Sequence, residues 1–350
     1  MKSLYAFTLL TCSAFLGHSQ YDASYLEFNN LRATISNNGV FFNNAGIFSP
    51  GYEIPKGSEN HAIYAMGFWF GGDDINGQLK LSAQTYTEGG DQFPGALTAG
   101  GTATAPVPAQ TDGIYAINKS DIDYHIANVG EVGYVTPSSI IDWPAHGDVA
   151  EGIDFNLAPF IDVDGDGIYD PEAGDYPKIK GDQALYMIMN DKADLHETGA
   201  DAIGLEIHYL FYQYATDDYL NNTTFVNMRV INRSTQTLYD FKAACFVDSD
   251  LGDGSDDYVG VKSDKNVMFA YNGTNYDNDY GENPPAVGVV LLNRDIDVFT
   301  SYNSGGGVMG DPVTPAHYYH YMNGRWQDGQ HFTEGGTGYG GVSETNFIYD

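Results

Sequence analysis

The chain has 350 residues and a formal net charge of −32 at pH 7, with 15 basic residues against 47 acidic ones. Such a negative charge repels nucleic-acid phosphates and anionic lipid surfaces. Few basic side chains are available to release counterions from a nucleic acid, so nucleic-acid binding is excluded. Hydrophobic residues make up 42% of the chain, which is enough for a sizeable core. The 27 tyrosines and 42 glycines favour strands joined by tight turns.

The first residues have the features of an export signal. Lys2 supplies a positive charge, residues 4–16 are apolar, and Gly17-His18-Ser19 offers small residues for cleavage. We therefore expect a signal peptide over residues 1–19 and a mature protein that is secreted or held at the outer cell surface. No later stretch reaches the roughly 18 apolar residues that a membrane span needs, so we expect no membrane span.

Residues 20–160 are expected to form an N-terminal β-rich region. The runs Ile63–Phe70 and Leu79–Tyr86 predict two strands, and the Gly, Asp and Asn residues between them predict a turn. Residues 97–113 are low in complexity and predict an exposed loop.

A short helix is predicted over Lys119–Ile126. Ser120 is a candidate for its N-terminal cap, and Ile122, Tyr124 and Ile126 are expected to turn partly toward the core. Helix is otherwise expected to be scarce.

Six carboxylates lie within the fourteen residues from Asp162 to Asp175, in the expected connector of residues 161–181. Carboxylates at the first, third, fifth and ninth positions of this loop, with glycine at the sixth, are the spacing with which a loop wraps around one Ca²⁺ ion. The expected ligands are Asp162, Asp164, Asp166, the backbone carbonyl of Ile168, and Asp170, with Glu172 or Asp175 replacing the glutamate that an EF-hand has at its twelfth position. The side chain of Ile168 is expected to pack inward. The alternative is a solvated acidic turn without an ion.

Residues 182–350 are expected to form a β-sandwich-like domain. Six runs rich in aromatic and β-branched residues predict strands: 184–189, 204–215, 223–232, 238–247, 266–271 and 286–292. Partial alternation in Glu206–Phe211 and Phe225–Val230 suggests half-buried antiparallel strands. The predicted fold class is therefore mainly β, an antiparallel β-sandwich or jelly roll with long loops and little helix.

Three further features of residues 182–350 have both a structural and a functional interpretation. Cys245 is the only cysteine after the signal peptide, so no internal disulfide can form, and its apolar surroundings indicate a buried thiol rather than a nucleophile. His196, Glu206 and His208 lack the spacing of a metal site and are expected to be structural. The acidic run Asp248–Asp257 remains open between a plain turn, a second cation site and a catalytic carboxylate pair.

An ordered set of short motifs resembles a family of large secreted proteins of Bacteroidota that are exported by the type IX secretion system. The motifs are Pro55–Ser58, Gly77–Leu79, Ala83–Tyr86, Ile141–Gly147, Asp175–Pro177, Lys180–Gln183, Asn221–Phe225, Ile231–Ser234, Asp250–Gly252, Asp256–Gly260 and Asn283–Gly288. The resemblance implies delivery to the cell surface or the medium and contact with the secretion machinery. Members typically end in a sorting domain that is absent here, so we expect this chain to be the front part of a longer protein. The resemblance implies no activity.

These observations lead to one functional hypothesis and one alternative. The leading hypothesis is an exported, calcium-stabilised, β-rich interaction protein without catalytic residues, whose partner is an extracellular glycan or a surface protein. The alternative is a carbohydrate-binding or carbohydrate-active secreted protein, in which exposed aromatic residues stack on sugars.

Overall fold

The computed structural model describes residues 21–350 except 45–46, 48, 87–89 and 102–110. The expected signal peptide and the middle of the 97–113 loop therefore lie outside the described residues. Leu97, Thr98 and Thr111, at the ends of that loop, are buried, so the exposure expected for the whole loop does not extend to its ends. Antiparallel strands dominate the architecture and helices are few and short, which confirms the predicted mainly β fold with a sandwich-like arrangement.

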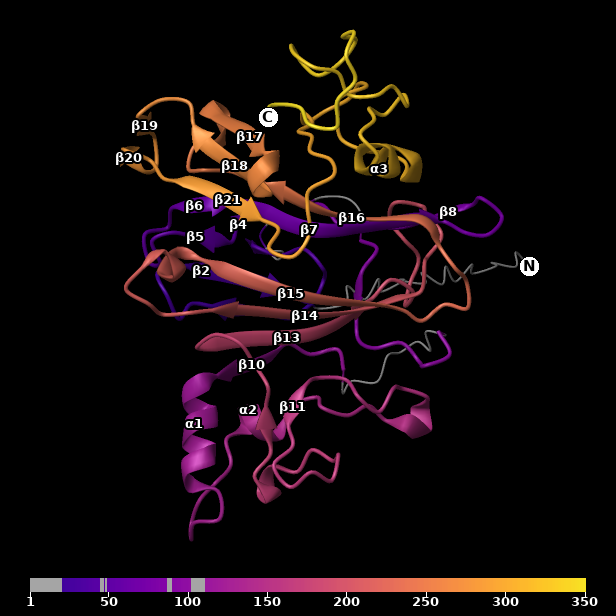
Figure 1. Ribbon diagram of the computed structural model, residues 1–350. Coiled ribbons are helices and arrows are strands. Elements are labelled where there is room, and N and C mark those ends of the chain that lie inside the picture. The colour runs from indigo at the N-terminus through magenta and orange to yellow at the C-terminus, as the bar shows by residue number, and fades with distance from the viewer. Residues whose placement is uncertain (1–20, 45–46, 48, 87–89, 102–110) are drawn as a thin grey trace, which may run out of the picture.

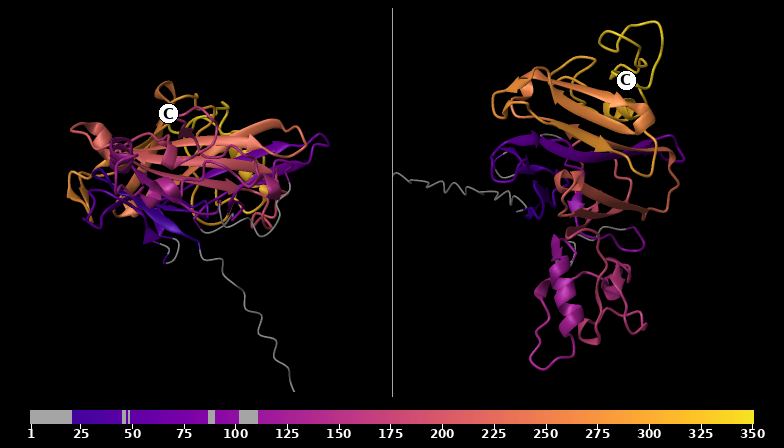
Figure 2. Two further views of the ribbon diagram at one scale, coloured as in Figure 1. Left: turned by 90° about the horizontal axis from the view of Figure 1, so that it is seen from below. Right: turned by 60° about the vertical axis from the view of Figure 1, so that its left-hand side comes forward.

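Antiparallel strands form a central sheet and an upper sheet, which stack as layers (Figures 1 and 2). The strands of the central sheet lie in the order β10 (Tyr115–Asn118), β13 (Gln183–Asn190), β14 (Leu205–Gln213) and β15 (Thr224–Asn232), and β9 (Phe93–Pro94) also pairs with β13. The upper sheet has the order β16 (Tyr239–Asp248), β7 (Ala65–Asp73) and β8 (Leu79–Ser82).

Smaller sheets surround these two. An N-terminal sheet has the order β1 (Ala23–Leu26), β2 (Arg32–Ser36), β5 (Tyr52–Glu53) and β6 (His61–Ile63), and an outer sheet has the order β17 (Asp257–Lys262), β18 (Val267–Asn272) and β21 (Ala286–Val290). Three two-stranded ladders pair β3 (Asn43–Asn44) with β4 (Ser49–Pro50), β11 (Phe160–Ile161) with β12 (Tyr176–Pro177), and β19 (Tyr276–Asp277) with β20 (Gly281–Glu282).

Helices lie at the two ends of the stack. A lower lobe carries α1 (Lys119–Asn128), α2 (Ser138–Ile141) and the 3₁₀ turns η1 (Val149–Glu151) and η2 (Pro171–Ala173), and α3 (Pro315–Met322) covers the far side of the upper sheet. Further 3₁₀ turns are η3 (Tyr219–Asn222), η4 (Gly254–Asp256) and η5 (Ser263–Lys265). Among the described residues no helix is long and apolar enough to cross a membrane.

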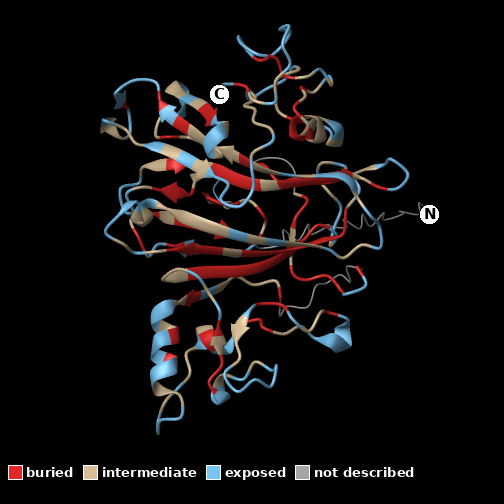
Figure 3. Cartoon of the chain, viewed as in Figure 1, coloured by how far each residue is buried: buried red, intermediate tan, exposed pale blue. Residues whose placement is uncertain are grey.

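Three hydrophobic clusters hold these layers together. The first lies between the central and upper sheets, where the ring of Tyr209 in β14 stacks on that of Phe68 in β7. The second lies on the opposite face of the central sheet, where Tyr186 packs on Trp143 of the lower lobe. The third joins the upper sheet to α3 and the C-terminal segment. Figure 3 shows the buried residues running along β13, β14 and β7.

Because both faces of the central sheet are covered, β13 and β14 are buried along almost their whole length. The half-buried alternation predicted for Glu206–Phe211 is therefore wrong, since it assumed one solvated face. The edge strand β15 is only partly buried and keeps some alternation, as predicted.

The predicted helix is present as α1, but its details differ. The residue at its N-cap is Asn118 rather than Ser120, and no side chain caps it. Ile122 is buried as expected, whereas Tyr124 and Ile126 are more than half exposed and His125 is buried in their place. A helix that packs along one narrow stripe buries residues three apart, and Ile122 and His125 have this spacing.

Strands from both sides of the expected connector pair with one another. Strand β7 pairs with β16 in the upper sheet, and β10 pairs with β13 in the central sheet. The expected division at residues 161–181 therefore does not coincide with the borders of the sheets.

Candidate metal centre

The acidic loop of residues 162–175 lies in the lower lobe, between the paired strands β11 and β12. Pairing of these two short strands brings the two ends of the loop together. Within the loop, Gly165 and Gly167 adopt positive φ angles of 78° and 81°. Other residues adopt this conformation only at an energetic cost, so the two glycines allow the chain to turn back on itself.

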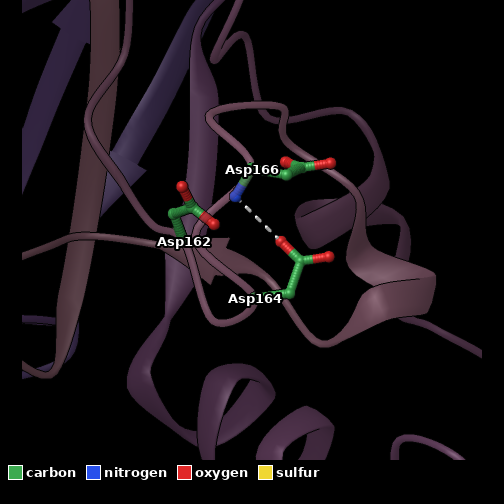
Figure 4. Close-up of side chains that lie close together, drawn as sticks. All are labelled: Asp162, Asp164 and Asp166. Carbon is green, nitrogen blue, oxygen red and sulfur yellow. Dashed lines mark hydrogen bonds between the residues drawn. The ribbon is translucent and has the colours of Figure 1, made fainter.

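Three carboxylates are brought together by this turn. Asp162, Asp164 and Asp166 each offer a carboxylate oxygen, and these oxygens lie within 4.8 Å of one another. Figure 4 shows the three side chains gathered at the turn, with the backbone N–H of Asp166 donating to Asp164 Oδ1 at 3.2 Å. Asp164 and Asp166 are exposed and Asp162 is half-buried, so the group is open to solvent on one side.

Backbone N–H groups order the first carboxylate. Gly165 and Gly167 donate to the two oxygens of Asp162 at 2.7 and 2.9 Å. The bond from Gly167, followed by that from Gly165, lowers the pKa of Asp162, so this residue is ionised at neutral pH.

Asp164 has the opposite tendency. The bond from the Asp166 N–H lowers its pKa, but partial desolvation and the neighbouring carboxylates of Asp166, Asp175 and Asp162 raise it above the usual value overall. The carboxylates therefore repel one another. A divalent cation bound among them would remove this repulsion and would favour the ionised form of Asp164.

The other residues expected as ligands have defined places in the structure. Asp175 is fully buried and accepts from the N–H groups of Val163 and Asp170 at 2.7 and 3.0 Å, so its carboxylate joins the two ends of the loop. Asp170 caps η2 by accepting from the N–H of Glu172 at 2.9 Å, and Glu172 is exposed. These three carboxylates do not belong to the group of Asp162, Asp164 and Asp166.

The side chain of Ile168 is 48% exposed, so the expectation that it packs inward is wrong. The next residue anchors the loop instead: Tyr169 donates its hydroxyl to the carbonyl of Ile140 at 2.6 Å and its N–H to Nε2 of His146 at 2.8 Å. An aromatic side chain with a polar tip can bury its ring and still form a hydrogen bond through its hydroxyl, so Tyr169 anchors the loop by both packing and hydrogen bonding.

The run Asp248–Asp257 lies elsewhere, between the upper and outer sheets. Asp277, on the β19–β20 hairpin, is buried beside it and accepts from the N–H of Asp253 at 2.9 Å. Sequence spacing could not associate Asp277 with this run, because Asp253 and Asp277 are more than twenty residues apart. Among the described residues, the only group with metal-ligand spacing is that of Asp162, Asp164 and Asp166.

Glu206 and His208 belong to a buried polar network that the sequence did not reveal. His208 Nε2 lies 2.9 Å from Glu206 Oε1, its Nδ1 lies 2.6 Å from the hydroxyl of Tyr186, and Arg233 bridges Glu206 and Asp154 at 2.7 and 3.0 Å. Burial raises the pKa of Glu206, but the hydrogen bonds from His208 and Arg233 lower it by more than burial raises it. The net shift of the pKa is therefore downward. This network pairs every charge it contains, which is consistent with the expected structural role.

His196 and Cys245 are also placed in packed surroundings. The His196 ring contacts the carbonyl of Asp191 through Nε2 and lies 3.5 Å from Asp91 through Nδ1. Cys245 is half-buried against the core between the two large sheets, and burial raises the pKa of its thiol to about 12. A thiol with so high a pKa is not an activated nucleophile, which favours its interpretation as a core residue, although it is partly buried and not fully buried as expected.

Comparison with known proteins adds no relative. No protein-family model, no curated protein and no solved structure matches this chain.

Proposed function

We propose that this protein is an exported, β-rich interaction protein whose lower lobe is stabilised by a calcium ion bound at Asp162, Asp164 and Asp166. The observation that supports this proposal is the convergence of the three carboxylate oxygens to within 4.8 Å on a glycine-containing turn. Oxygen ligands in a flexible loop suit Ca²⁺, which takes 6–8 of them, better than Mg²⁺, which requires a near-octahedral site.

The proposed role of the ion is to hold the acidic loop in its folded conformation within the lower lobe. The loop joins β11 to β12, Tyr169 bonds it to Ile140 of α2, and Asp175 bonds its two ends together. A cation bound only in the folded state stabilises that state by mass action, by about 2.7 kcal/mol at a hundredfold excess over Kd. This contribution matters for a chain that has no disulfide among its described residues.

The proposal assigns no catalytic residue. Carboxylates that coordinate a cation stay ionised and are poor general acids, and the buried carboxylate of Glu206 is already engaged by His208 and Arg233. Export is supported by the signal-like sequence of residues 1–19 and by the resemblance to proteins of the type IX secretion system.

The proposal is tested by replacing two ligands. In the variant Asp164→Ala with Asp166→Ala we expect the melting temperature to be the same with millimolar calcium as with EDTA, whereas EDTA should lower that of the wild-type protein. The control is Asp194→Ala with Asp217→Ala, which removes two exposed carboxylates outside the loop and so matches the change in net charge. The control should keep the full response to calcium. A wild-type protein that melts at one temperature under both conditions would falsify the calcium proposal.

A further inference from the structure

The outer sheet has one face packed on the protein and one face turned to solvent (Figure 1 and the right-hand view of Figure 2). Side chains of paired residues in an antiparallel sheet point to the same side. The register therefore places nine residues on the outward face in three rows: Tyr258, Tyr271 and Ala286; Gly260, Phe269 and Gly288; Lys262, Val267 and Val290. The residues between them, such as Val261 and Ala270, face inward and are buried.

The composition of the outward face is opposite to what solvent contact requires. One-sided antiparallel sheets are usually polar on the solvated face, yet Lys262 is the only charged residue among these nine. Tyr258 is 59% exposed, Tyr271 44% and Val290 48%. Contiguous apolar surface of this kind marks an interaction site more often than scattered exposed residues do.

Glycines let the aromatic rings lie low on the sheet. A Cβ atom at Gly260 would come within 2.7 Å of the tip of the Phe269 ring, and one at Gly273 within 2.4 Å of the Tyr258 ring, so both rings occupy space that a side chain would otherwise fill. The Tyr271 ring lies 5.9 Å from that of Tyr258 and 6.0 Å from that of Phe269, with tilts of 26° and 35° between the ring planes. The three rings thus form a continuous, shallow strip, which we call the aromatic strip.

The charges around the aromatic strip disfavour an anionic partner. At one end, Lys262 lies 3.7 Å from Asp264 and 4.0 Å from Asp350, and Lys265 lies 3.7 Å from Asp264, so each of these exposed cations has a carboxylate beside it. The net charge of −32 repels acidic polymers and a second copy of the chain alike. An anionic occupant is therefore disfavoured, and the near-absence of charge on the aromatic strip itself suits an occupant that is neutral, flat and apolar on one side.

We propose that the aromatic strip binds a neutral polysaccharide, with pyranose rings stacked on Tyr258, Phe269 and Tyr271. The C–H face of a pyranose is flat and apolar, and it packs against the electron-rich face of an aromatic ring, while its hydroxyls remain in water. This inference rests on the proposed function only in placing the protein outside the cell, where such polymers occur. The aromatic strip belongs to the outer sheet and the calcium loop to the lower lobe, so the two sites can be tested separately.

The test is isothermal titration calorimetry of the mature protein with four neutral hexasaccharides, made of β-1,4-glucose, β-1,3-glucose, β-1,4-xylose and β-1,4-mannose. We expect at least one to bind, Tyr271→Ala to weaken that binding about tenfold or more, and Tyr271→Phe to keep it because the ring remains. Tyr219→Ala is the matched control, since it removes a tyrosine that is 77% exposed but lies outside the outer sheet.

A second variant blocks the aromatic strip without removing a ring. A Cβ at Gly288 would meet its nearest atoms, on Met268 and Val267, at 3.6 Å, which is ordinary contact, so Gly288→Thr should fold with an unchanged melting temperature. Residue 288 is paired with Phe269 in the sheet, so the side chain that Gly288→Thr introduces would stand beside the Phe269 ring and should abolish binding.

Three outcomes overturn the proposal. The first is the absence of binding by the wild-type protein to all four sugars, and the second is binding that both Tyr271→Ala and Gly288→Thr retain. The third is a wild-type dimer in sedimentation velocity that Gly288→Thr abolishes, which would make this face a contact between copies. Asp164→Ala with Asp166→Ala should bind the sugar as the wild type does, so failure of the calcium site and failure of the aromatic strip are distinguishable.

Discussion

Two aspartates of the run Asp248–Asp257 are held in surroundings that disfavour their charge. Burial, followed by the nearby Asp250 and Asp311, raises the pKa of Asp248 to about 6. Burial likewise raises the pKa of Asp257 to about 6, although the N–H of Leu251 donates to it at 2.9 Å. Neither residue forms an ion pair within the described part of the chain.

These shifts predict a pH dependence of stability. Because the folded pKa exceeds the unfolded value of about 4, the folded state holds these protons more tightly, and its advantage is lost as the pH rises from about 4 through about 6. In EDTA we expect the melting temperature to be higher at pH 5 than at pH 7. The variant Asp248→Asn with Asp257→Asn should lose much of this difference, and the exposed control Asp194→Asn should retain it. An equal pH response in all three proteins would contradict the assignment to this pair.

At the scale of elements, one buried carboxylate holds the connection from β13 to β14. Asp191 follows the last residue of β13 and is fully buried. Its two oxygens accept from the N–H groups of Ile203, Gly204 and Leu205 at 2.6 to 2.8 Å, which fixes the point where β14 begins. The long loop between the two strands is thereby closed at its base.

Removal of this carboxylate should be costly. Asp191→Ala leaves three buried N–H groups without an acceptor, and each such group costs about 1–3 kcal/mol, so we expect the free energy of unfolding to fall by about 3 kcal/mol or more. Asp194→Ala, in the same loop but exposed, is expected to change it by less than about 0.5 kcal/mol. Urea denaturation followed by tryptophan fluorescence measures both. A loss for Asp191→Ala no larger than that for Asp194→Ala would show that these bonds do not contribute.

At the scale of the whole molecule, strands distant in sequence complete each other's sheets. Strand β7 lies between β16 and β8, and β13 lies between β10 and β14. A fragment of residues 182–350 would lose β7, β10 and the lower lobe at once, and would expose Tyr209 and Tyr186 to water.

We therefore predict that residues 182–350 do not fold alone, whereas residues 20–350 unfold in one cooperative transition. The measurement is the dispersion of amide signals in a proton–nitrogen NMR spectrum of the fragment, together with calorimetry of the longer chain. A well-dispersed fragment spectrum, or two separate calorimetric transitions, would support the domain border expected from the sequence instead.

Local pattern was sufficient for the long strands β7, β13, β14, β15 and β16, for α1 and for the turn at Asp162–Asp166, but not for short strands such as β1 to β5. Each depends on neighbours within a few residues: runs such as 223–232 are rich in β-branched residues, and the loop has glycines where the chain must turn. Tertiary structure alone decided that β14 is covered on both faces, that Asp277 lies beside Asp253, and that Tyr258, Phe269 and Tyr271 share one outward face. These relations join residues whose separation along the chain carries no periodic signal, and they arise only when pairing and packing set the register of distant strands.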